Sequence, residues 1–482
     1  MVSHSLLLQA IETHAKSQPD KTAIIVDNHM ISYEELYRNI CRAANTLTSW
    51  QVKPGDTIIL SAQKNIEFIY FYFGAQMSGI INTILDASSN ENRTRYIEEK
   101  VHPKICLGYI SPNYPSKLFS EIKLDDAEDR DYFSNDSISS NDTAEIIFTT
   151  GTTGNPKGVL LSYKNISSSA NNINGYIQNT TNDIELLALP ICHSFGLGRI
   201  RCIMIKGATV ILLGSFANVK LFLKAIETYH VTGFGVVPAA WVYIRKISGT
   251  RITKYAKQIK YIEIGSSSMP LSVKREMLSF FPETRICMHY GLTEASRSTF
   301  IEFHDETHLA SIGKAVSSEV ELVVMDSEGK PCPDNVSGEL CVKGNMVIKS
   351  YLDEHDNSHA FWGDYFRTGD CAFHSVDGYF YYVGRDKELI NVGGKKVSPM
   401  EVEDAICSLG VGDCIVVGRE DKDGIMGEMV KAYILKGSTD LSFNEISQKL
   451  SLILEYYKLP SVYEWIDEIP TTQSGKKQRL AI

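Results

Sequence analysis

The sequence lacks the patterns that indicate a disulfide framework or a structural zinc site. Its 10 cysteines are scattered and no C-x-x-C pair occurs, so neither arrangement is predicted. Scattered cysteines are typical of reduced thiols, and we expect a cytoplasmic protein. Two histidine pairs at helical spacing, His304/His308 and His355/His359, lack the glutamate that a zinc-protease helix places after its first histidine. We expect both pairs to be ordinary surface residues.

Long apolar runs and an excess of positive charge are also lacking. No uninterrupted apolar stretch is long enough to span a bilayer, so we expect no membrane insertion. Residues 1–10 contain an apolar patch but no basic flank or cleavage site, which predicts the first helix of the fold rather than a signal peptide. The formal net charge of -10 disfavours nucleic acid as the main partner, because phosphate backbones require clustered lysine and arginine.

What the sequence does contain is a regular alternation of β-branched apolar runs and amphipathic helices. A strand is expected at Ala23–Asp27, and Ser32 with Glu35 predicts a capping box that opens the next helix. Further strands are expected at Thr57–Ser61, Ile80–Leu85, Glu145–Thr149, Leu186–Leu189, Ala208–Leu213, Gly233–Val237, Tyr261–Ile264 and Arg285–His289. This alternation predicts an α/β fold with layered, mostly parallel sheets.

After Ile312 the pattern changes to short strands separated by turns. Strands are expected at Glu319–Met325, Gly338–Val342 and Tyr379–Val383, which together predict a small β-rich subdomain over 312–385. An α+β unit follows, with helices at Pro399–Leu409 and Ser442–Leu454 and strands at Cys414–Gly418 and Val430–Leu435. About a hundred residues suffice for a separate domain. We therefore predict a large domain at 1–385 and a small C-terminal domain at 386–482. The Ser/Asp/Asn-rich segment Asp125–Thr143 is expected to be an exposed connection.

The most informative segment is residues 146–159, which read I-I-F-T-T-G-T-T-G-N-P-K-G-V. Glycine lets backbone N–H groups turn toward an anion, threonine adds hydroxyl donors and Lys157 adds positive charge. The spacing is not a Walker A loop, since Pro156 stands where that motif has glycine and no Ser or Thr follows Lys157. The segment predicts a polyphosphate site made by Thr149, Thr150, Gly151, Thr152, Thr153, Gly154 and Lys157.

This loop resembles the phosphate-binding signature of the adenylate-forming superfamily, and the family's other motifs follow in order along nearly the whole chain. H-Y-G-L-T-E at His289–Glu294 resembles the second nucleotide motif. The resemblance implies that Tyr290 stacks on adenine, with Gly291 beside it, that Thr293 contacts phosphate and that Glu294 binds magnesium. An aromatic ring and a carboxylate suit these roles. G-S-S-S-M-P at 265–270 resembles the adenine-flanking loop, which implies nucleotide contacts for Ser266 and Ser267.

Two further motifs resemble the ribose site and the hinge of that family. R-T-G-D at 367–370 resembles the segment whose aspartate binds both ribose hydroxyls, here Asp370, a role that suits the paired acceptor oxygens of a carboxylate. G-R-D-K at 384–387 resembles the hinge, which implies that Arg385 reaches the ribose and that Lys387 is the pivot near 386–388. The small domain is accordingly expected to be mobile.

The C-terminal domain carries two more motifs of the family. P-T-T-Q-S-G-K-K-Q-R at 470–479 resembles the terminal motif with the mobile catalytic lysine, here Lys476. N-V-G-G-K-K at 391–396 resembles the segment that approaches the adenylate in the second half-reaction, where Gly394 would let the pantetheine arm of the thiol pass close to the backbone. An ordinary glycine turn between strand and helix remains the alternative for this segment.

The resemblance implies ATP- and Mg²⁺-dependent activation of a small carboxylic acid to an acyl-adenylate, followed by acyl transfer to the thiol of CoA. Charge builds up on phosphate oxygens, so the reaction needs positioned cations rather than a protein nucleophile; Thr293, Glu294 and Lys476 are the expected catalytic residues. The alternative is a ligase that loads a separate phosphopantetheine carrier protein, since no carrier segment follows Lys476. A non-catalytic nucleotide-binding homologue is disfavoured because Glu294, Asp370 and Lys476 are all present.

The acid itself is less well defined. P-I-C-H-S-F-G-L at 190–197 resembles the substrate segment of acyl-CoA synthetases, with His193 near the acid. Ser194 stands approximately where amino-acid-activating members have an aspartate, and an unpaired buried ammonium is costly, so an α-amino acid is disfavoured. Expected pocket residues are Gly265 and an apolar set consistent with an aliphatic or aromatic acid, although these could equally be core: Val236, Val237, Pro238, Ala239 and Trp241. Two departures from the family pattern, Asp86–Ser89 and Ser350, are expected to be peripheral.

Overall fold

The computed structural model describes residues 4–124, 138–150, 156–385, 388–421, 427–471, 477–479 and 482, with the side chain of Thr150 left out. Most of the predicted connection Asp125–Thr143 therefore lies outside the described residues. In the part of the chain that is described, no helix is both long and apolar enough to cross a membrane.

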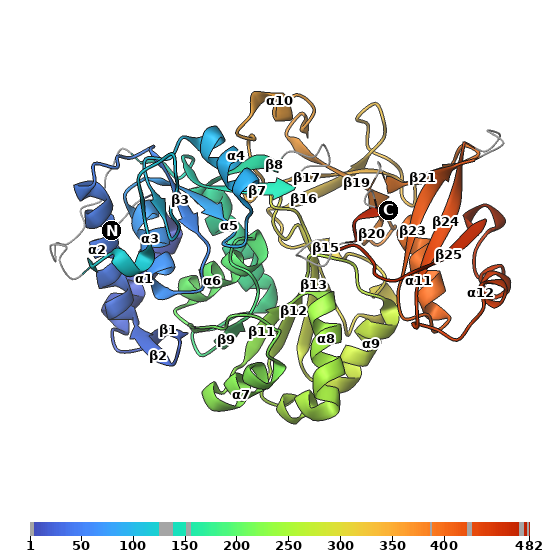
Figure 1. Cartoon of the computed structure of the whole chain (residues 1–482), viewed down its shortest axis with the longest axis horizontal. Helices are drawn as coiled ribbons and strands as arrows, with labels where there is room; N and C mark the ends of the chain where they lie inside the picture. Colours follow the sequence, from blue (N-terminus) through green and yellow to red (C-terminus); the bar gives the residue numbers. More distant parts are fainter. Residues whose placement is uncertain are drawn as a thin grey trace.

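The larger of two mixed sheets in the N-terminal half has the strand order β15-β14-β13-β12-β11-β9-β10-β1-β2 within the described residues (Figure 1). The strands from β13 to β1 are parallel, and antiparallel strands lie only at the two edges. Its members are β1 (Thr22–Val26), β2 (His29–Ser32), β9 (Ile184–Leu187), β10 (Thr209–Leu212), β11 (Gly233–Val236), β12 (Tyr261–Ile264), β13 (Arg285–Tyr290), β14 (Thr299–Glu302) and β15 (Lys314–Ala315). Strands β10, β11 and β12 are buried along their whole length, as expected for parallel strands covered on both faces, and the charged Glu263 of β12 is buried with them.

The second sheet has the order β6-β5-β3-β4-β7-β8 and is parallel except for its last pair. Its members are β3 (Thr57–Ser61), β4 (Ile81–Leu85), β5 (Cys106–Leu107), β6 (Ser116–Lys117), β7 (Thr143–Thr150) and β8 (Pro156–Ser162). The antiparallel pair β7–β8 flanks the predicted phosphate loop, so the two ends of that loop are fixed by a sheet. The prediction of layered, mostly parallel sheets is confirmed.

Helices cover and separate these sheets: α1 (Leu6–Ser17), α2 (Tyr33–Ser49), α3 (Ile66–Met77), α4 (Glu91–Val101), α5 (Tyr163–Ile177), α6 (Ser194–Lys206), α7 (Val219–Tyr229), α8 (Pro238–Ser248) and α9 (Leu271–Phe280). Helices α5 and α6 pack on each other near the middle of the molecule (Figure 1). The predicted capping box is only half present: Ser32 Oγ accepts from the Glu35 backbone N–H at 3.1 Å, and no reciprocal bond accompanies it among the described contacts.

The β-rich segment forms an antiparallel sheet of β16 (Glu321–Met325), β17 (Gly338–Lys343), β18 (Phe361–Trp362), β19 (Tyr365–His374) and β20 (Phe380–Arg385), with the short helix α10 (Glu354–Asn357). Sequence analysis identified three of these strands. It missed β18 and β19, because β19 contains polar residues of the R-T-G-D motif and does not read as an apolar run.

The C-terminal part begins with the hairpin β21 (Ile390–Val392) and β22 (Lys395–Val397) and continues with α11 (Pro399–Ser408), β23 (Cys414–Glu420), β24 (Glu428–Leu435), α12 (Phe443–Leu450) and β25 (Val462–Ile466). It has a hydrophobic core of its own, formed by residues between Ile390 and Leu450, and none of these belongs to the core of the N-terminal half. We propose that the domain boundary lies at residues 385–388, two of which, Asp386 and Lys387, are outside the described residues.

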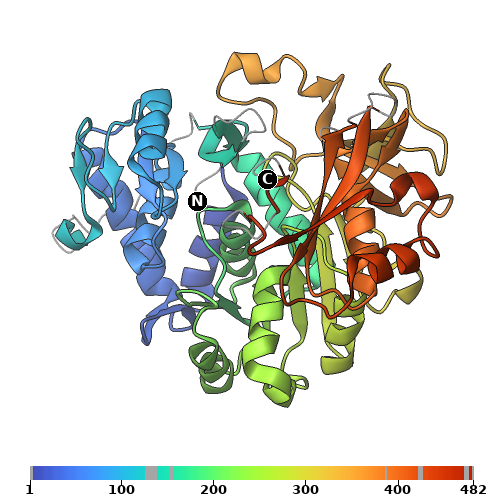
Figure 2. The same ribbon diagram turned by 45° about the vertical axis from the view of Figure 1, so that its right-hand side comes forward.

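The two parts meet through polar groups. In Figure 2 the red C-terminal segment lies in front of the yellow-green part of the large domain. Lys274 on α9 is buried and donates to the Leu309 carbonyl at 2.7 Å. Asp404 on α11 lies close enough for its charge to interact with that lysine. Burial lowers the pKa of Lys274 to about 8 and raises the pKa of Asp404 to about 6, and each charge partly offsets the shift of the other.

Candidate active site

A cleft of 1870 Å³ opens between the two sheets, the β-rich segment and the start of the C-terminal part. Residues that follow the carboxyl ends of parallel strands line it, which is where ligands bind in α/β proteins. The predicted site residues that line the cleft are Thr149, Lys157, His193, Val237, Ser266, Gly291, Thr293, Glu294, Asp370 and Arg385. Segments more than two hundred residues apart in the sequence therefore face one space.

Other predicted residues do not line this cleft. Ser267, Tyr290, Pro238, Gly265 and Gly394 are described but contribute no lining surface. Gly394 lies in the turn between β21 and β22 with φ +83°, and a Cβ added there would meet no atom within 4 Å. The left-handed backbone explains why a glycine stands at this position. The role of Gly394 toward the thiol stays a prediction. Six predicted residues, and the side chain of Thr150, lie outside the described part of the chain: Gly151, Thr152, Thr153, Gly154, Lys387 and Lys476.

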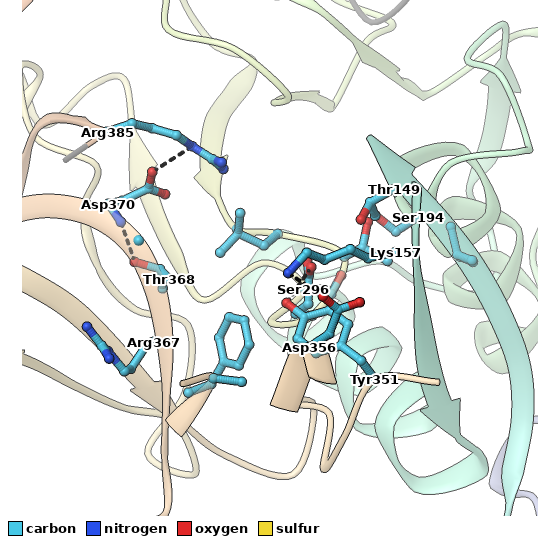
Figure 3. Close-up of a pocket in the computed structure, with 18 of the residues that line it drawn as sticks. Thr149, Lys157, Ser194, Ser296, Tyr351, Asp356, Arg367, Thr368, Asp370 and Arg385 are labelled. Atoms are coloured by element: carbon cyan, nitrogen blue, oxygen red, sulfur yellow. Dashed lines mark hydrogen bonds and ion pairs between the residues drawn. The ribbon is translucent and has the colours of Figure 1, made fainter. Parts of the chain in front are cut away.

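Lys157 is held at the mouth of the predicted phosphate loop. It lies opposite Thr149 in the β7–β8 ladder. Its Nζ is 2.8 Å from Asp356 Oδ1 and 5.3 Å from the centre of the Tyr351 ring (Figure 3). The lysine is only partly exposed, at 27% of its side chain. An ammonium placed in this way can exchange Asp356 for a phosphate oxygen.

Glu294 is the buried carboxylate of the cleft, with 9% of its surface exposed. Its Oε1 accepts a hydrogen bond from the Tyr351 hydroxyl at 2.9 Å. Burial raises the pKa of Glu294, although this hydrogen bond and the charges of Arg385 and Lys157 lower it in part. A buried carboxylate whose charged form is disfavoured gains from a hard cation, so the residues present fit Mg²⁺.

Asp370 lies at the end of the cleft where we expect the ribose, and it contacts two neighbouring side chains there. Its Oδ2 accepts from the Tyr290 hydroxyl at 2.6 Å, and its Oδ1 lies 3.1 Å from Arg385 Nε (Figure 3). The Asp370 backbone N–H donates to Thr368 Oγ1 at 3.1 Å. Tyr290 thus contributes its hydroxyl to the aspartate, and stacking of its ring on adenine stays a prediction. A carboxylate oxygen can accept two hydrogen bonds, which suits the role toward ribose hydroxyls that we expect for Asp370.

The other end of the cleft, near the amino terminus of α6, contains His193. Burial lowers the pKa of His193; the charge of Asp86 opposes this shift in part and that of Arg93 adds to it, so the imidazole is neutral near pH 7. Asp86 was expected to be peripheral, and this is wrong: ligand atoms of Asp86, Cys192 and His193 all lie within 4.8 Å of one another. Sequence reasoning also missed Arg93 and Lys100, which line the cleft from one face of α4. These two residues are seven positions apart, a spacing that places them on the same face of a helix, and this was the signal in the sequence that could have identified them.

Of the five residues expected to form an apolar wall of the acid pocket, only Val237 lines the cleft. Val237 lines the cleft, but Val236, Pro238 and Trp241 are buried in the core, and Trp241 packs against Phe280 and Phe281. This end of the cleft is lined by apolar residues, among them Leu189, Pro190 and Phe195, and by polar or charged ones: Ser194, His289, Ser296 and Arg297. Ser194 and His289 lie within motifs that sequence analysis quoted, whereas Ser296 and Arg297 could have been suggested only by their position shortly after the Y-G-L-T-E motif.

Comparison with known proteins agrees with this geometry. Residues 11–352 match the AMP-binding enzyme family and residues 401–476 match the AMP-binding enzyme C-terminal domain. A 2-succinylbenzoate–CoA ligase of Bacillus licheniformis is 26% identical over 97% of this chain and 98% of its own length. A feruloyl-CoA synthase of Amycolatopsis is 27% identical over 96% and 95%.

Solved structures show the same similarity. The o-succinylbenzoate CoA synthetase of Bacillus subtilis, in complex with an acyl-adenylate intermediate, has a TM-score of 0.88 and 25% identity over 98% of this chain and 97% of that chain. ATP-bound MatB of Rhodopseudomonas palustris has a TM-score of 0.89 at 24% identity over 98% of both chains, which shows the shared fold.

Proposed function

This chain belongs to the AMP-binding enzyme family, and from that membership we propose that it is an acid–thiol ligase that forms an acyl-adenylate from ATP and transfers the acyl group to CoA. In the first step a carboxylate oxygen of the acid attacks the α-phosphorus of ATP, and the bond to pyrophosphate breaks. In the second step the CoA sulfur attacks the acyl carbon, its proton passes to solvent and AMP leaves.

The observation that carries this proposal is the meeting of Lys157, Glu294 and Asp370 in one cleft. We assign Lys157 and Thr149 to the phosphates, with the loop 150–154. Asp370, supported by Arg385 and Tyr290, is assigned to the ribose. Glu294 would hold Mg²⁺, which when bound offsets the negative charge on the phosphate oxygens.

Lys476 would supply a further positive charge from the small domain. Two unit charges about 4 Å apart interact by roughly 1 kcal/mol in water but by about 4 kcal/mol at an effective dielectric near 20. A lysine delivered into a closed cleft is therefore more effective than one in solvent, and this favours a small domain that moves about a hinge near Lys387.

For the acceptor we propose free CoA, because the related 2-succinylbenzoate–CoA ligase and feruloyl-CoA synthase are both named for that product. Lys396, next to the Gly394 turn, lines the cleft and brings the hairpin β21–β22 to its edge. We also propose a cytoplasmic location, since the ten cysteines, all within the described residues, are free thiols.

The test is acid-dependent exchange of labelled pyrophosphate into ATP across a panel of carboxylic acids, followed by detection of the acyl thioester with CoA or with a phosphopantetheinylated carrier protein. We expect Mg²⁺-dependent exchange and an acyl-CoA product. Exchange that yields a thioester only on carrier protein would replace CoA as the acceptor. Absence of exchange with every acid would overturn the proposed function.

A further inference from the structure

The acid end of the cleft is closed by the imidazole of His289. The ring lies directly against Gly265: a methyl group at that glycine would be 2.1 Å from both His289 Nε2 and Cε1. On its other sides the imidazole is fixed by Glu263, whose Oε1 is 2.8 Å from Nδ1, and by Phe195, whose ring meets it edge-on at 4.7 Å. His289 therefore fills the space directly beside Gly265 at the wall of the cleft.

The groups behind His289 form a rigid charged network. Arg297 Nε lies 3.2 Å from Glu263 Oε1, and its two terminal nitrogens donate to the carbonyls of Ser194 and Phe195 at 2.8 and 2.9 Å. Arg199 binds the other oxygen of Glu263 at 3.0 Å. Glu263 and Arg199 are completely buried. Breaking such a network leaves buried charges without partners, so this wall does not yield to a longer substrate.

The wall presents two hydroxyl groups to the cleft beside the Phe195 ring. Ser194 and Ser296 lie with Thr149 and Lys157 around the same space (Figure 3). Ser296 Oγ accepts from Arg297 Nη1 at 3.2 Å, which leaves its own hydroxyl hydrogen for an acceptor on a ligand. Val236 and Trp241 are buried elsewhere, and the apolar surface at this end comes from Leu189, Pro190, Phe195 and Val237.

We propose that His289, pressed against Gly265 and backed by Glu263 and Phe195, limits the enzyme to short carboxylic acids that carry a second oxygen function. The inference rests on the proposed function and names its acid substrate. A long alkyl chain or an aromatic ring would meet the imidazole, whereas a hydroxyl, oxo or second carboxyl group can accept hydrogen bonds at the end of the pocket.

The first experiment uses the unmodified enzyme and needs no variant. Pyrophosphate exchange is measured with butanoate, 3-hydroxybutanoate and succinate, which have equal chain length, and with decanoate and cinnamate. We expect kcat/KM for the best short acid to exceed that for decanoate and cinnamate by about 100-fold, since each misfitting methylene costs roughly 10-fold or more. An oxygen-bearing acid should exceed butanoate by about 10-fold.

These results separate the two proposals. Exchange that is fastest with decanoate or cinnamate would overturn the inference and leave the proposed function standing. Exchange with no acid would remove the proposed function itself. Butanoate equal to or better than both oxygen-bearing acids would overturn the requirement for a second oxygen.

Variants test the role of His289 directly. His289→Ala should raise kcat/KM for decanoate or cinnamate relative to the short acid by about 10-fold, whereas His289→Gln, which fills similar space, should keep the short-acid preference. Gly265→Ala alone should lose most activity, and the double variant Gly265→Ala/His289→Ala should recover part of it, because the methyl group then has room. His304→Ala, with 43% of its side chain exposed and bonded to Glu302, is the matched control.

Thermal unfolding of each variant shows whether it is folded. An unchanged acid profile in folded His289→Ala, or strictly additive losses in the double variant, would contradict the inference.

Discussion

Asp370 and Arg385 face each other across the antiparallel pair β19–β20, and this register places the guanidinium Nε 3.1 Å from the carboxylate Oδ1. The backbone pairing of two strands thus fixes the charge distribution at one end of the cleft before any ligand binds. Because Arg385 is also the last described residue before the proposed hinge, the same contact joins the nucleotide site to the start of the small domain.

Asp370→Asn should weaken ATP binding. The amide keeps the shape of the side chain but loses the charge that holds Arg385 and one acceptor oxygen for the ribose. Hydrogen bonds to charged groups contribute about 1.5–3 kcal/mol, so KM for ATP should rise by about 10- to 100-fold. The measurement is pyrophosphate exchange at varied ATP. Asp364→Asn, an exposed aspartate bound to Lys343 on the same sheet, serves as the control and should leave KM for ATP unchanged.

Lys157→Ala should reduce adenylate formation more than it reduces binding of the acid. Removal of one positioned donor at developing charge typically costs about 100-fold in rate. Single-turnover formation of acyl-adenylate measures the effect. Lys330→Ala removes an exposed lysine bound to Glu328 and should have no effect. Equal losses in the two variants would argue against the phosphate role of Lys157.

Mg²⁺ binding at Glu294 should be lost at a higher pH, as the solution is acidified, than it would be at an exposed glutamate. Burial raises the pKa of Glu294, so the ionised form that binds Mg²⁺ is lost as pH falls through that raised value. The pH dependence of the apparent Mg²⁺ affinity, with Glu294→Asp for comparison, checks this. An acidic limb at the ordinary glutamate pKa would contradict it.

The same shift predicts that Glu294→Gln stabilises the ligand-free protein near pH 7 while it removes activity. A carboxyl group whose folded-state pKa is raised loses its stabilising contribution as pH rises through that pKa, because the charged form must be buried. The amide carries no such penalty. Thermal unfolding near pH 5 and near pH 8 should show a larger gain for the variant at the higher pH. A lower melting temperature at pH 8 would show that the Tyr351 hydrogen bond outweighs burial.

Lys476→Ala should separate the two half-reactions. Adenylate formation should fall by about 100-fold, since the charge delivered to the phosphates is lost. Transfer from supplied acyl-adenylate to CoA should persist, because that step follows withdrawal of the lysine. Lys436→Ala, an exposed lysine bound to Asp467 in the same domain, provides the control. Equal loss of both half-reactions would contradict the proposal that Lys476 acts in adenylate formation but not in transfer to CoA.

Local sequence was sufficient wherever one segment both forms an element and carries a motif. The strands Thr57–Ser61 and Tyr261–Ile264 have the bounds expected from their apolar patterns. Helix α5 was not predicted, because its sequence is rich in serine and asparagine and its formation depends on burial against α6 and the core. Site residues inside motifs were predicted for the same local reason.

The remaining site residues depend on contacts between distant segments. Asp86 reaches His193 only because β4 and α6 converge, and Arg93 enters the cleft only through the placement of α4. The sequence predicted Trp241 as a pocket residue, but its ring packs in the core against Phe280 and Phe281. A pattern within a short stretch of sequence does not predict packing between segments that are far apart in the chain.

The separate hydrophobic cores of the two domains have a thermodynamic consequence for domain alternation. If the small domain turns about residues near 386–388 as a rigid body, neither core is opened to water. The heat capacity of the protein depends on hydrated apolar surface, so the two domain arrangements should differ little in this quantity. Their equilibrium should instead respond to ionic strength, because the charges of Lys274 and Asp404 interact across the boundary.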